Sequence, residues 1–312
     1  MRAIGIMAFG GPDVLEVVEL PDPVAGPGEV GIRVHAATVN PTDTVLRSGG
    51  RAERLRDIAP PHVPGMEAAG ILDQIGDGVD ARLRLGDRVM AIVLPLGHHG
   101  AYAERVVVPV ESVVRAPVGS THAEAATLPM NGLTVRRALD ALALEPGQTL
   151  AVTGAAGSVG GYAVQMGRVG GLRIVADAAP ADEDLVRALG AEVIVHRGND
   201  FAAEVRSVLP DGADALIDTA LLDARAVGAV REGGAVVTLR GYDPPGHRGI
   251  TFHPIYVRHY AREQAKLEQL RLLAEAGALT MRVARTLTAD RAPEAHRLLE
   301  SGGVRGRLVL QF

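Results

Sequence analysis

Apolar and polar residues follow two different patterns along the chain. Up to about residue 117, short apolar runs such as residues 2–8, 15–20 and 30–38 are separated by Gly, Pro and Asp residues. Runs of this length that contain many β-branched residues predict strands. Strands at this spacing indicate a small, twisted or barrel-like β domain over residues 1–117.

The pattern changes near residue 118, where longer segments with helical spacing of apolar residues begin. Helices are predicted over residues 123–128 and 132–144, after which strands and helices alternate as far as residue 239. The strands are expected at residues 149–153, 172–176, 192–195, 215–218 and 235–239, with helices at 158–170, 182–189, 200–209 and 222–231. This alternation is typical of an α/β domain with a doubly wound parallel sheet, which binds ligands at the carboxyl ends of its strands.

The last part of the chain predicts a turn at residues 242–246, an extended stretch at 249–257 and a helix at 263–276. A further helix over residues 292–301 and a strand over 307–312 follow. Because a late strand can complete the first β domain, we expect that domain to be discontinuous. The predicted organisation is residues 1–117 and 251–312 around a second domain at residues 118–250.

The most specific local pattern lies where the strand at 149–153 meets the helix at 158–170, and it contains three glycines spaced three apart. The loop consists of Gly154, Ala155, Ala156, Gly157, Ser158, Val159 and Gly160. Glycines let the backbone approach a pyrophosphate closely, and the start of the helix faces the anion with N–H groups and a positive dipole end. The loop therefore predicts a dinucleotide site, although a strand-to-helix turn can also require glycine for its positive φ alone.

Composition narrows the classes of function. A chain of 312 residues with 47% hydrophobic and 22% charged residues is long enough for two globular domains. Its formal charge of −5, without a basic run, argues against a nucleic-acid partner. No apolar stretch approaches the ~18 residues of a membrane span and no signal-peptide layout is visible, so we expect a cytoplasmic protein that does not bind membranes.

Seven motifs spread over nearly the whole chain occur in the order seen in the medium-chain dehydrogenase/reductase superfamily. They are residues 40–49 (NPTDTVLRSG), 63–70 (VPGMEAAG), 86–89 (GDRV), 100–104 (GAYAE), 128–134 (LPMNGLT), the loop 154–160, and 294–296 (EAH) with 306–310 (GRLVL). Within that superfamily, the chain resembles the zinc-free quinone oxidoreductase branch. The resemblance implies a Rossmann domain, a discontinuous GroES-like β-rich domain, and NAD(P)H-dependent hydride transfer to a small-molecule quinone or to the activated C=C bond of an enone or enoyl ester.

The resemblance and the composition both predict an enzyme without a metal. Zinc-dependent relatives hold the catalytic ion with Cys and with a His before the Glu, whereas this chain has no cysteine and Met66 precedes Glu67. The four-cysteine structural zinc lobe of those relatives is missing as well. We therefore expect neither zinc nor another metal.

Asn40, Asp43 and Arg47 match the N-x-x-D-x-x-x-R segment that the family places under the nicotinamide and the substrate cleft. An equally simple role for Asn40 and Asp43 is to cap the helix that begins there. Many zinc-free relatives have a tyrosine where Val45 stands, so no phenol proton donor is expected at that position.

Two adjacent histidines, His98 and His99, are the candidate proton donors, because histidine titrates near neutrality and either could protonate the enolate or quinol oxygen. The alternative is that both are exposed loop residues. Met66, Met130 and Asn131 are expected to line the substrate pocket, with the methionines forming an adaptable apolar wall. Tyr102 is a further candidate for the pocket, and its alternative role is to pack as part of the family's Gly-x-Tyr-Ala-Glu turn.

Asp177 lies 23 positions after Gly154 and 20 after Gly157, the separation expected for a carboxylate that binds the cofactor ribose. An acid there repels a 2′-phosphate and favours NADH, whereas the family favours NADPH, so NAD(H) and NADP(H) both remain open. Thr134 is a candidate contact for cofactor phosphate or ribose, or it bonds to its own backbone. The other cofactor residues that the resemblance implies are Asp218, Arg240, Gly241 and Arg307.

Two other functions remain compatible with these motifs: a nucleotide-binding protein with little redox activity, and a reductase devoted to one biosynthetic intermediate. The resemblance also implies a homodimer, in which the extended stretch at residues 249–257 would pair with its copy.

Overall fold

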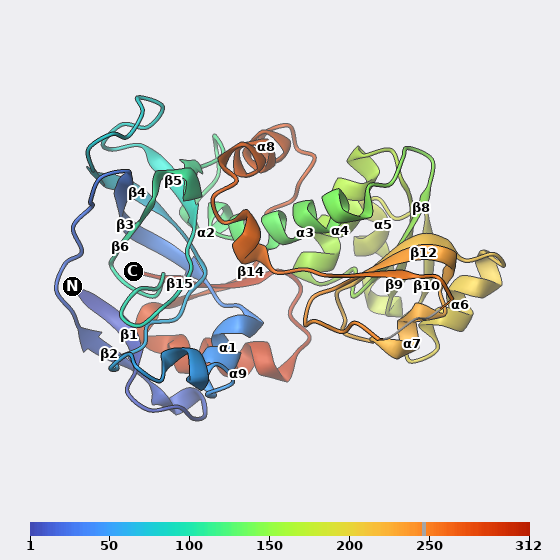
Figure 1. The fold of residues 1–312 in the computed structure, drawn as a ribbon, viewed down its shortest axis with the longest axis horizontal. Coiled ribbons are helices and arrows are strands. Elements are labelled where there is room, and N and C mark those ends of the chain that lie inside the picture. Colours follow the sequence, from blue (N-terminus) through green and yellow to red (C-terminus); the bar gives the residue numbers. More distant parts are fainter. Residues whose placement is uncertain (245–247) are drawn as a thin grey trace. The chain divides into compact units, whose positions relative to one another are not determined.

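The computed structural model describes residues 1–244 and 248–312, which form two compact units (Figure 1). The first unit contains residues 1–130, 258–275 and 281–312, and the second contains residues 131–257 and 276–280. Residues 118–130 pack with the first unit. The boundary between the two units therefore lies after Met130, later than the boundary near residue 118 that the sequence pattern predicted. The turn predicted at 242–246 extends into residues that are outside the described part of the chain.

A seven-stranded sheet forms the first unit, in the order β14-β15-β3-β4-β5-β7 with β6 paired to β3. Its strands are β3 (Glu29–Thr38), β4 (Glu67–Ile75), β5 (Arg88–Ile92), β6 (Arg105–Pro109), β7 (Val113–Arg115), β14 (Val283–Thr288) and β15 (Arg307–Gln311). The strands β1 (Arg2–Ile6) and β2 (Leu15–Glu19) form a separate antiparallel hairpin. Strand β15 pairs antiparallel with β3 through Val309 and Thr38, so the end of the chain completes the first sheet, as the sequence predicted.

Strand β14 has no counterpart in the sequence prediction. Of its six residues only Leu287 is buried, so the alternation that marks a half-buried strand is absent. The strand forms because it pairs in parallel with β15, a contact between segments that the local pattern does not link.

The first unit also contains short helices. They are α1 (Pro41–Arg47), α2 (His122–Ala125), α8 (Gln264–Glu275), α9 (Ala292–Ser301) and the 3₁₀ turns η1 (Pro12–Val14), η2 (Ala52–Leu55), η3 (Val110–Ser112), η5 (Val257–Tyr260) and η6 (Ala289–Arg291). Helix α1 has Pro41 at its first position, and the Asp43 carboxylate accepts the Asn40 backbone N–H. The capping role considered for these two residues is therefore present.

The second unit is a six-stranded, fully parallel sheet in the order β10-β9-β8-β11-β12-β13, which confirms the predicted doubly wound fold. Its strands are β8 (Thr149–Thr153), β9 (Arg173–Ala178), β10 (Val193–His196), β11 (Ala213–Asp218), β12 (Val230–Thr238) and β13 (Thr251–Pro254). All five residues of β8 are buried, as expected for a strand covered on both faces.

The helices of the second unit are α3 (Pro129–Leu142, from Asn131 onward), α4 (Ser158–Val169), α5 (Glu183–Leu189), with the turn η4 (Pro180–Asp182) before it, α6 (Phe201–Val208) and α7 (Ala224–Val227). Helix α4 packs beside α5, and α6 packs beside α7 (Figure 1). The helix predicted at 222–231 was wrong in its length, because α7 ends at Val227 and Val230 already pairs with Ala213 in the sheet. Within the described residues, no helix combines the length and the apolar character needed to cross a bilayer.

Phe201 offers a direct test of the packing of the second unit. Its side chain is fully buried at the start of α6, in a cluster with Val205, Leu216 and Val230. Replacing it by alanine should lower the free energy of unfolding by about 3–5 kcal/mol, because a large cavity replaces the ring. Urea unfolding followed by far-ultraviolet circular dichroism would measure this loss.

The matched control lies on the same helix, where Val208 is 46% exposed. Val208→Ala should change the free energy of unfolding by no more than about 0.5 kcal/mol. Equal losses in the two variants would contradict the assignment of α6's buried face.

Candidate functional site

The glycine loop has the geometry that a pyrophosphate requires. Gly154 adopts a φ of +65°, in the left-handed region, and a Cβ on Gly160 would lie 2.2 Å from the carbonyl oxygen of Gly154. The loop and the first turn of α4 can therefore pack this closely only without a side chain at Gly160. Gly157 is the N-cap of α4 and provides no side-chain cap, and the first turn holds no acidic residue. The positive end of the helix dipole favours an anion at this position.

Other predicted cofactor residues lie at the same carboxyl edge of the parallel sheet. Asp218 ends β11 opposite Thr153 of β8, and Arg240 and Gly241 follow the end of β12. Thr153 Oγ1 donates to Asp218 Oδ1 at 2.6 Å, and the Asp223 N–H donates to Asp218 Oδ2 at 2.7 Å. Both oxygens of Asp218 thus hold the ends of the strands in place.

Asp177 lies in β9, beside the glycine loop, and is only 2% exposed. Its Oδ1 accepts the Ala155 N–H at 3.0 Å, which ties the loop to the neighbouring strand. Burial raises the pKa of this carboxyl, while the Ala155 N–H and the charge of Arg197 oppose that rise. Arg197 follows β10 and was not singled out from the sequence, because only the pairing of β10 with β9 brings it beside Asp177.

These features fit a dinucleotide cofactor. The loop can hold the pyrophosphate, and Asp177 stands one strand away, where the adenosine ribose lies in such folds. Asn131 and Thr134 are both buried in α3 of the same unit. Arg197 adds a positive charge near Asp177 that the sequence pattern had not suggested.

In the first unit, a fully buried ion pair joins Glu67 at the start of β4 to Arg307 at the start of β15. Arg307 Nη2 lies 2.5 Å from Glu67 Oε1 and donates to Asn40 Oδ1 at 2.7 Å. Asn40 Nδ2 donates to Glu67 Oε1 at 3.3 Å, and the Met130 N–H donates to Oε2 at 2.7 Å. Asn40, Met130 and Arg307, which the sequence predicted for three different roles, thus belong to one network.

A second buried network is centred on Asp43. The N–H groups of Asn40 and Gly65 donate to its two carboxylate oxygens at 2.8 and 3.0 Å, and the Tyr102 hydroxyl donates at 3.4 Å. Burial raises the pKa of Asp43 to about 6, although these N–H groups and the charge of Arg307 oppose that rise. Burial also raises the pKa of Tyr102, so its hydroxyl stays protonated and remains a donor.

The Asp43 network continues through His296 to the surface. Arg47 pairs with Glu300 at 2.6 Å, and its Nη1 lies 3.4 Å from His296 Nδ1. Because a guanidinium only donates, Nδ1 accepts and the proton of neutral His296 lies on Nε2, which is 3.2 Å from the Tyr102 oxygen. Burial and the charge of Arg47 lower the pKa of His296 to about 3. Hydrogen bonds can therefore run in one direction from Arg47 to Asp43.

The candidate proton donors lie in a hairpin loop after β5. His98 is exposed, whereas His99 is partly buried and its backbone pairs with that of Leu96. Burial lowers the pKa of His99. His62, which the sequence did not suggest, is 6% exposed and stacks on Phe9 with ring centroids 5.7 Å apart.

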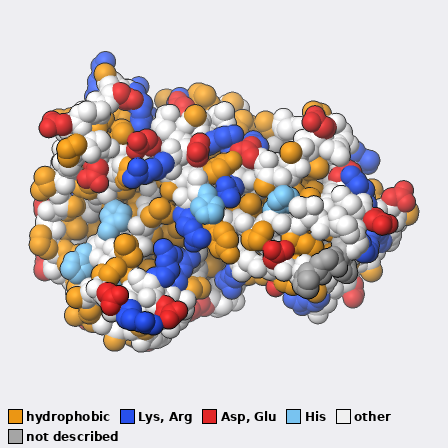
Figure 2. Space-filling view, in the orientation of Figure 1, with side chains coloured by type: hydrophobic (Ala, Val, Ile, Leu, Met, Phe, Trp, Pro, Cys, Tyr) orange, Lys and Arg blue, Asp and Glu red, His pale blue; other side chains and the backbone are white. Residues whose placement is uncertain are grey.

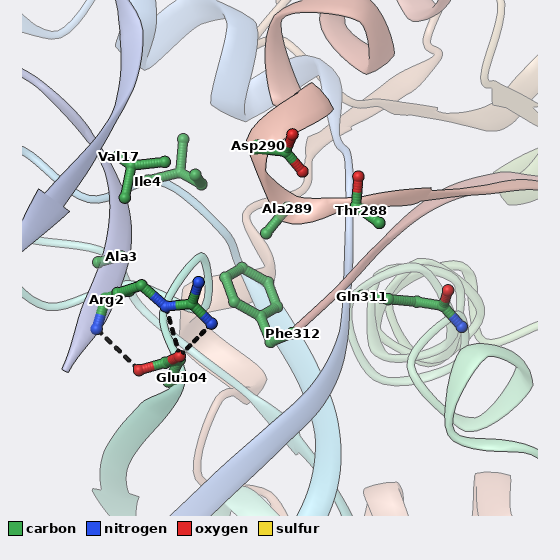
Figure 3. Close-up of a pocket in the computed structure, with 10 residues that line it drawn as sticks. All are labelled: Arg2, Ala3, Ile4, Val17, Glu104, Thr288, Ala289, Asp290, Gln311 and Phe312. Carbon is green, nitrogen blue, oxygen red and sulfur yellow. Dashed lines mark hydrogen bonds and ion pairs between the residues drawn. The ribbon is translucent and has the colours of Figure 1, made fainter.

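Among the described residues, no three His, Asp or Glu side chains are grouped as metal ligands. Met66 is buried, and its sulfur accepts the Thr42 hydroxyl at 2.9 Å. A cavity of about 300 Å³ lies elsewhere in the first unit, where Arg2 and Glu104 pair at 2.8 Å (Figure 3). None of the predicted site residues lines this cavity.

His296 predicts a pH dependence of stability. Its pKa is about 3 in the folded protein and about 6.5 in the unfolded protein. Between pH 6.5 and pH 3 the imidazole therefore binds a proton in the unfolded state and stays neutral in the folded state. His296 therefore contributes stability above pH 6.5 that is lost as the pH falls toward 3. The free-energy difference between the protein and His296→Gln should shrink by up to about 1.4 kcal/mol per pH unit across this window.

Asp43 has the opposite effect on stability. Its raised pKa lets the folded state bind a proton between pH 6 and the ordinary carboxyl pKa of 3.8, so protonation there favours the folded state. It is present in both proteins, so subtracting their urea unfolding curves isolates His296. A difference that does not vary with pH would show that His296 titrates alike in both states.

Comparison with known proteins identifies the family. Residues 26–118 match the family model of the alcohol dehydrogenase GroES-like domain, and residues 189–310 match the model named zinc-binding dehydrogenase. A crystal structure of an NAD-dependent alcohol dehydrogenase is 31% identical, with a TM-score of 0.87, and the match covers the whole of both chains.

Two curated relatives have named activities. The chloroplastic NADPH-dependent alkenal/one oxidoreductase of Arabidopsis thaliana is 32% identical over 80% of this chain and 65% of its own length. The quinone oxidoreductase of Mus musculus is 33% identical over 70% of this chain and 66% of its own length. The chain spans between about half and two-thirds of the length of the curated relatives that it matches. Fold and sequence together show that the chain belongs to the medium-chain dehydrogenase/reductase superfamily.

Proposed function

We propose that the protein is an NAD(P)H-dependent reductase that transfers hydride to a quinone or to the activated C=C bond of an enone or enoyl compound, without zinc. The observation that carries this proposal is the glycine cradle at the carboxyl edge of the parallel sheet, with Asp177 beside it. The named activities of the Arabidopsis and mouse relatives support the choice of acceptor.

The second unit would hold the cofactor through residues 154–160 at the pyrophosphate and Asp177 at the ribose. Thr134, Asp218, Arg240 and Gly241 remain proposed contacts. When bound, the nicotinamide supplies the hydride from its C4 position. Asp177 favours a free 2′-hydroxyl, whereas the nearby charge of Arg197 favours a 2′-phosphate, so these two residues set the balance between NADH and NADPH.

The first unit would orient the acceptor next to Asn40 and Asp43. The side-chain amide of Asn40 is fixed at both ends, since Arg307 donates to its oxygen and its nitrogen donates to Glu67. An amide held in one orientation loses little conformational entropy when it binds a substrate. Its proposed contribution to the rate is therefore to orient the acceptor. Met66, Met130 and Tyr102 of the first unit are proposed to shape the pocket around it.

The absence of zinc is proposed from the donor set of this chain. The sequence has no cysteine, and the carboxylate of Glu67 is already paired with a permanent cation, the guanidinium of Arg307. For proton delivery we favour His98 over His99. Burial lowers the pKa of His99, which disfavours the imidazolium form that a proton donor needs near neutral pH.

We also propose a homodimer in a cytoplasmic setting. Strand β13 is the last strand in the sheet order of the second unit, and its pairing with β12 leaves one edge for a copy of itself in a two-fold dimer. The lack of cysteine suits a reducing compartment.

The purified protein should oxidise NADH or NADPH when a quinone or an enone is supplied, and the loss of reduced-nicotinamide absorbance measures this. A panel of both cofactors against several quinones and enones covers the proposed acceptors. The proposal fails if neither cofactor supports turnover of any acceptor. Cofactor binding by calorimetry without turnover would instead favour a nucleotide-binding protein with little redox activity.

Asp177→Ser should raise kcat/KM for NADPH relative to NADH by about tenfold, because it removes the carboxylate that repels a 2′-phosphate. Asp177→Asn is the matched control, since it removes the charge but keeps an oxygen for the Ala155 N–H. Arg197→Gln should act in the opposite direction and weaken NADPH alone. An unchanged cofactor preference in all three variants would refute the ribose assignment.

A further inference from the structure

The cavity in Figure 3 is formed by the first unit alone, and none of the proposed site residues lines it. Its walls include two pairs of neighbouring strands. Ile4 of β1 is the Cα partner of Val17 in β2, and Thr288 of β14 is the Cα partner of Gln311 in β15. The cavity therefore lies where the β1–β2 hairpin meets the end of the seven-stranded sheet. Its volume of about 300 Å³ is at the lower end of the range for small-molecule sites.

One wall of the cavity is fixed by the pair of Arg2 and Glu104. The Arg2 backbone N–H donates to Glu104 Oε2 at 2.8 Å, and Nε and Nη2 of the guanidinium each lie 2.8 Å from Oε1. The Glu104 N–H donates to the Arg2 carbonyl at 3.0 Å, and the Ile4 N–H donates to the Tyr102 carbonyl at 2.7 Å. The wall is thus held in place by the protein itself, and the charges of Arg2 and Glu104 compensate each other.

Asp290 is the third charged residue of the lining, and its charge is not compensated. The two arginines nearest to it in the sequence, Arg285 and Arg291, both pair with Glu294, at 3.2 and 2.5 Å. In the part of the chain that the structure describes, the Asp290 carboxylate has neither an ion-pair nor a hydrogen-bond partner. On the face drawn in Figure 2, by contrast, many Asp and Glu side chains lie beside Lys or Arg side chains. The charged side chains of the cavity therefore sum to −1, which favours a cation.

The other side chains give the cavity an apolar surface. Ala3 and Ile4 are buried beneath it, and Val17 is 53% exposed. Figure 3 shows the ring of Phe312 between the Arg2 side chain and Ala289. A ligand that covers Val17 and Phe312 removes apolar surface from water, and the face of an aromatic ring also attracts a cation.

We propose that this cavity binds a small organic cation, with the apolar part of the ligand against Val17 and Phe312 and its ammonium or guanidinium group at Asp290. A carboxylate binds such a group through charge-assisted hydrogen bonds, which are stronger than those between neutral groups. The cavity is separate from the proposed reductase centre, so neither proposal depends on the other.

The test compares the cation 2-phenylethylammonium with 2-phenylethanol, a neutral ligand of nearly the same shape, in titrations followed by ligand-detected NMR. The cation should bind with a Kd of about 1 mM or lower. It should bind at least about fivefold more tightly than the alcohol. Asp290→Asn should weaken binding of the cation about fivefold and leave binding of the alcohol within about twofold.

Asp57→Asn is the matched control, because Asp57 is an exposed aspartate of the same unit that does not line the cavity. It should leave both affinities unchanged. Val17→Trp introduces a large ring at an exposed strand position, where aromatic residues are tolerated, and should prevent both ligands from binding. Thermal melting verifies that each variant is folded.

Equal affinities for the cation and the alcohol, or no binding of the cation, would overturn the inference. Equal losses of cation binding in Asp290→Asn and Asp57→Asn would also overturn it, because the effect would then follow the net charge of the protein. Cation binding that survives in Val17→Trp would show that the ligand occupies another place. Turnover of a quinone or an enone is not measured in this test, so its failure leaves the proposed reductase intact.

Discussion

The buried ion pair between Glu67 and Arg307 is the interaction on which the first unit's site depends. Both side chains are almost fully buried, so removing either partner would leave a charge without compensation in a low-dielectric interior. The pair joins β4 to β15, and it orients Asn40 between them. Arg307 reaches this position only because β15 pairs with β3, so the discontinuous domain is a requirement of the site.

Asp43, only three residues from Asn40, is stabilised in a different way. Two backbone N–H groups and a phenol bind its carboxylate, and no cation within residues 1–244 and 248–312 forms an ion pair with it, so burial brings its pKa to about 6. His296 at the other side of Tyr102 is held neutral. The first turn of helix α1 is thus fixed twice: Asn40 is bound by the Glu67–Arg307 ion pair, and Asp43 is bound by two backbone N–H groups and Tyr102.

The parallel sheet and the glycine loop could be predicted because each depends on residues close together in the sequence. The partners of the site could not. Glu67 and Arg307 are 240 residues apart, and Arg197 reaches Asp177 only through the pairing of β10 with β9. Asn40 and Asp43 were found by their motif, which left open whether they cap α1 or serve the reaction. The structure shows the cap, and capping a helix does not prevent a residue from serving a reaction as well.

Arginine supplies nearly all the permanent positive charge of this chain, in which Lys266 is the only lysine. The arginines differ in whether a carboxylate of the protein pairs with them. Arg307 and Arg47 are buried, and each is paired with a carboxylate, Glu67 or Glu300, so their charges are used within the protein. Arg51 has no such partner in the described residues, although it is partly buried. Because a guanidinium does not lose its proton, an unpaired one retains its full attraction for an anion. The same argument applies to Arg197 beside Asp177, where the proposed anion is the 2′-phosphate of NADPH.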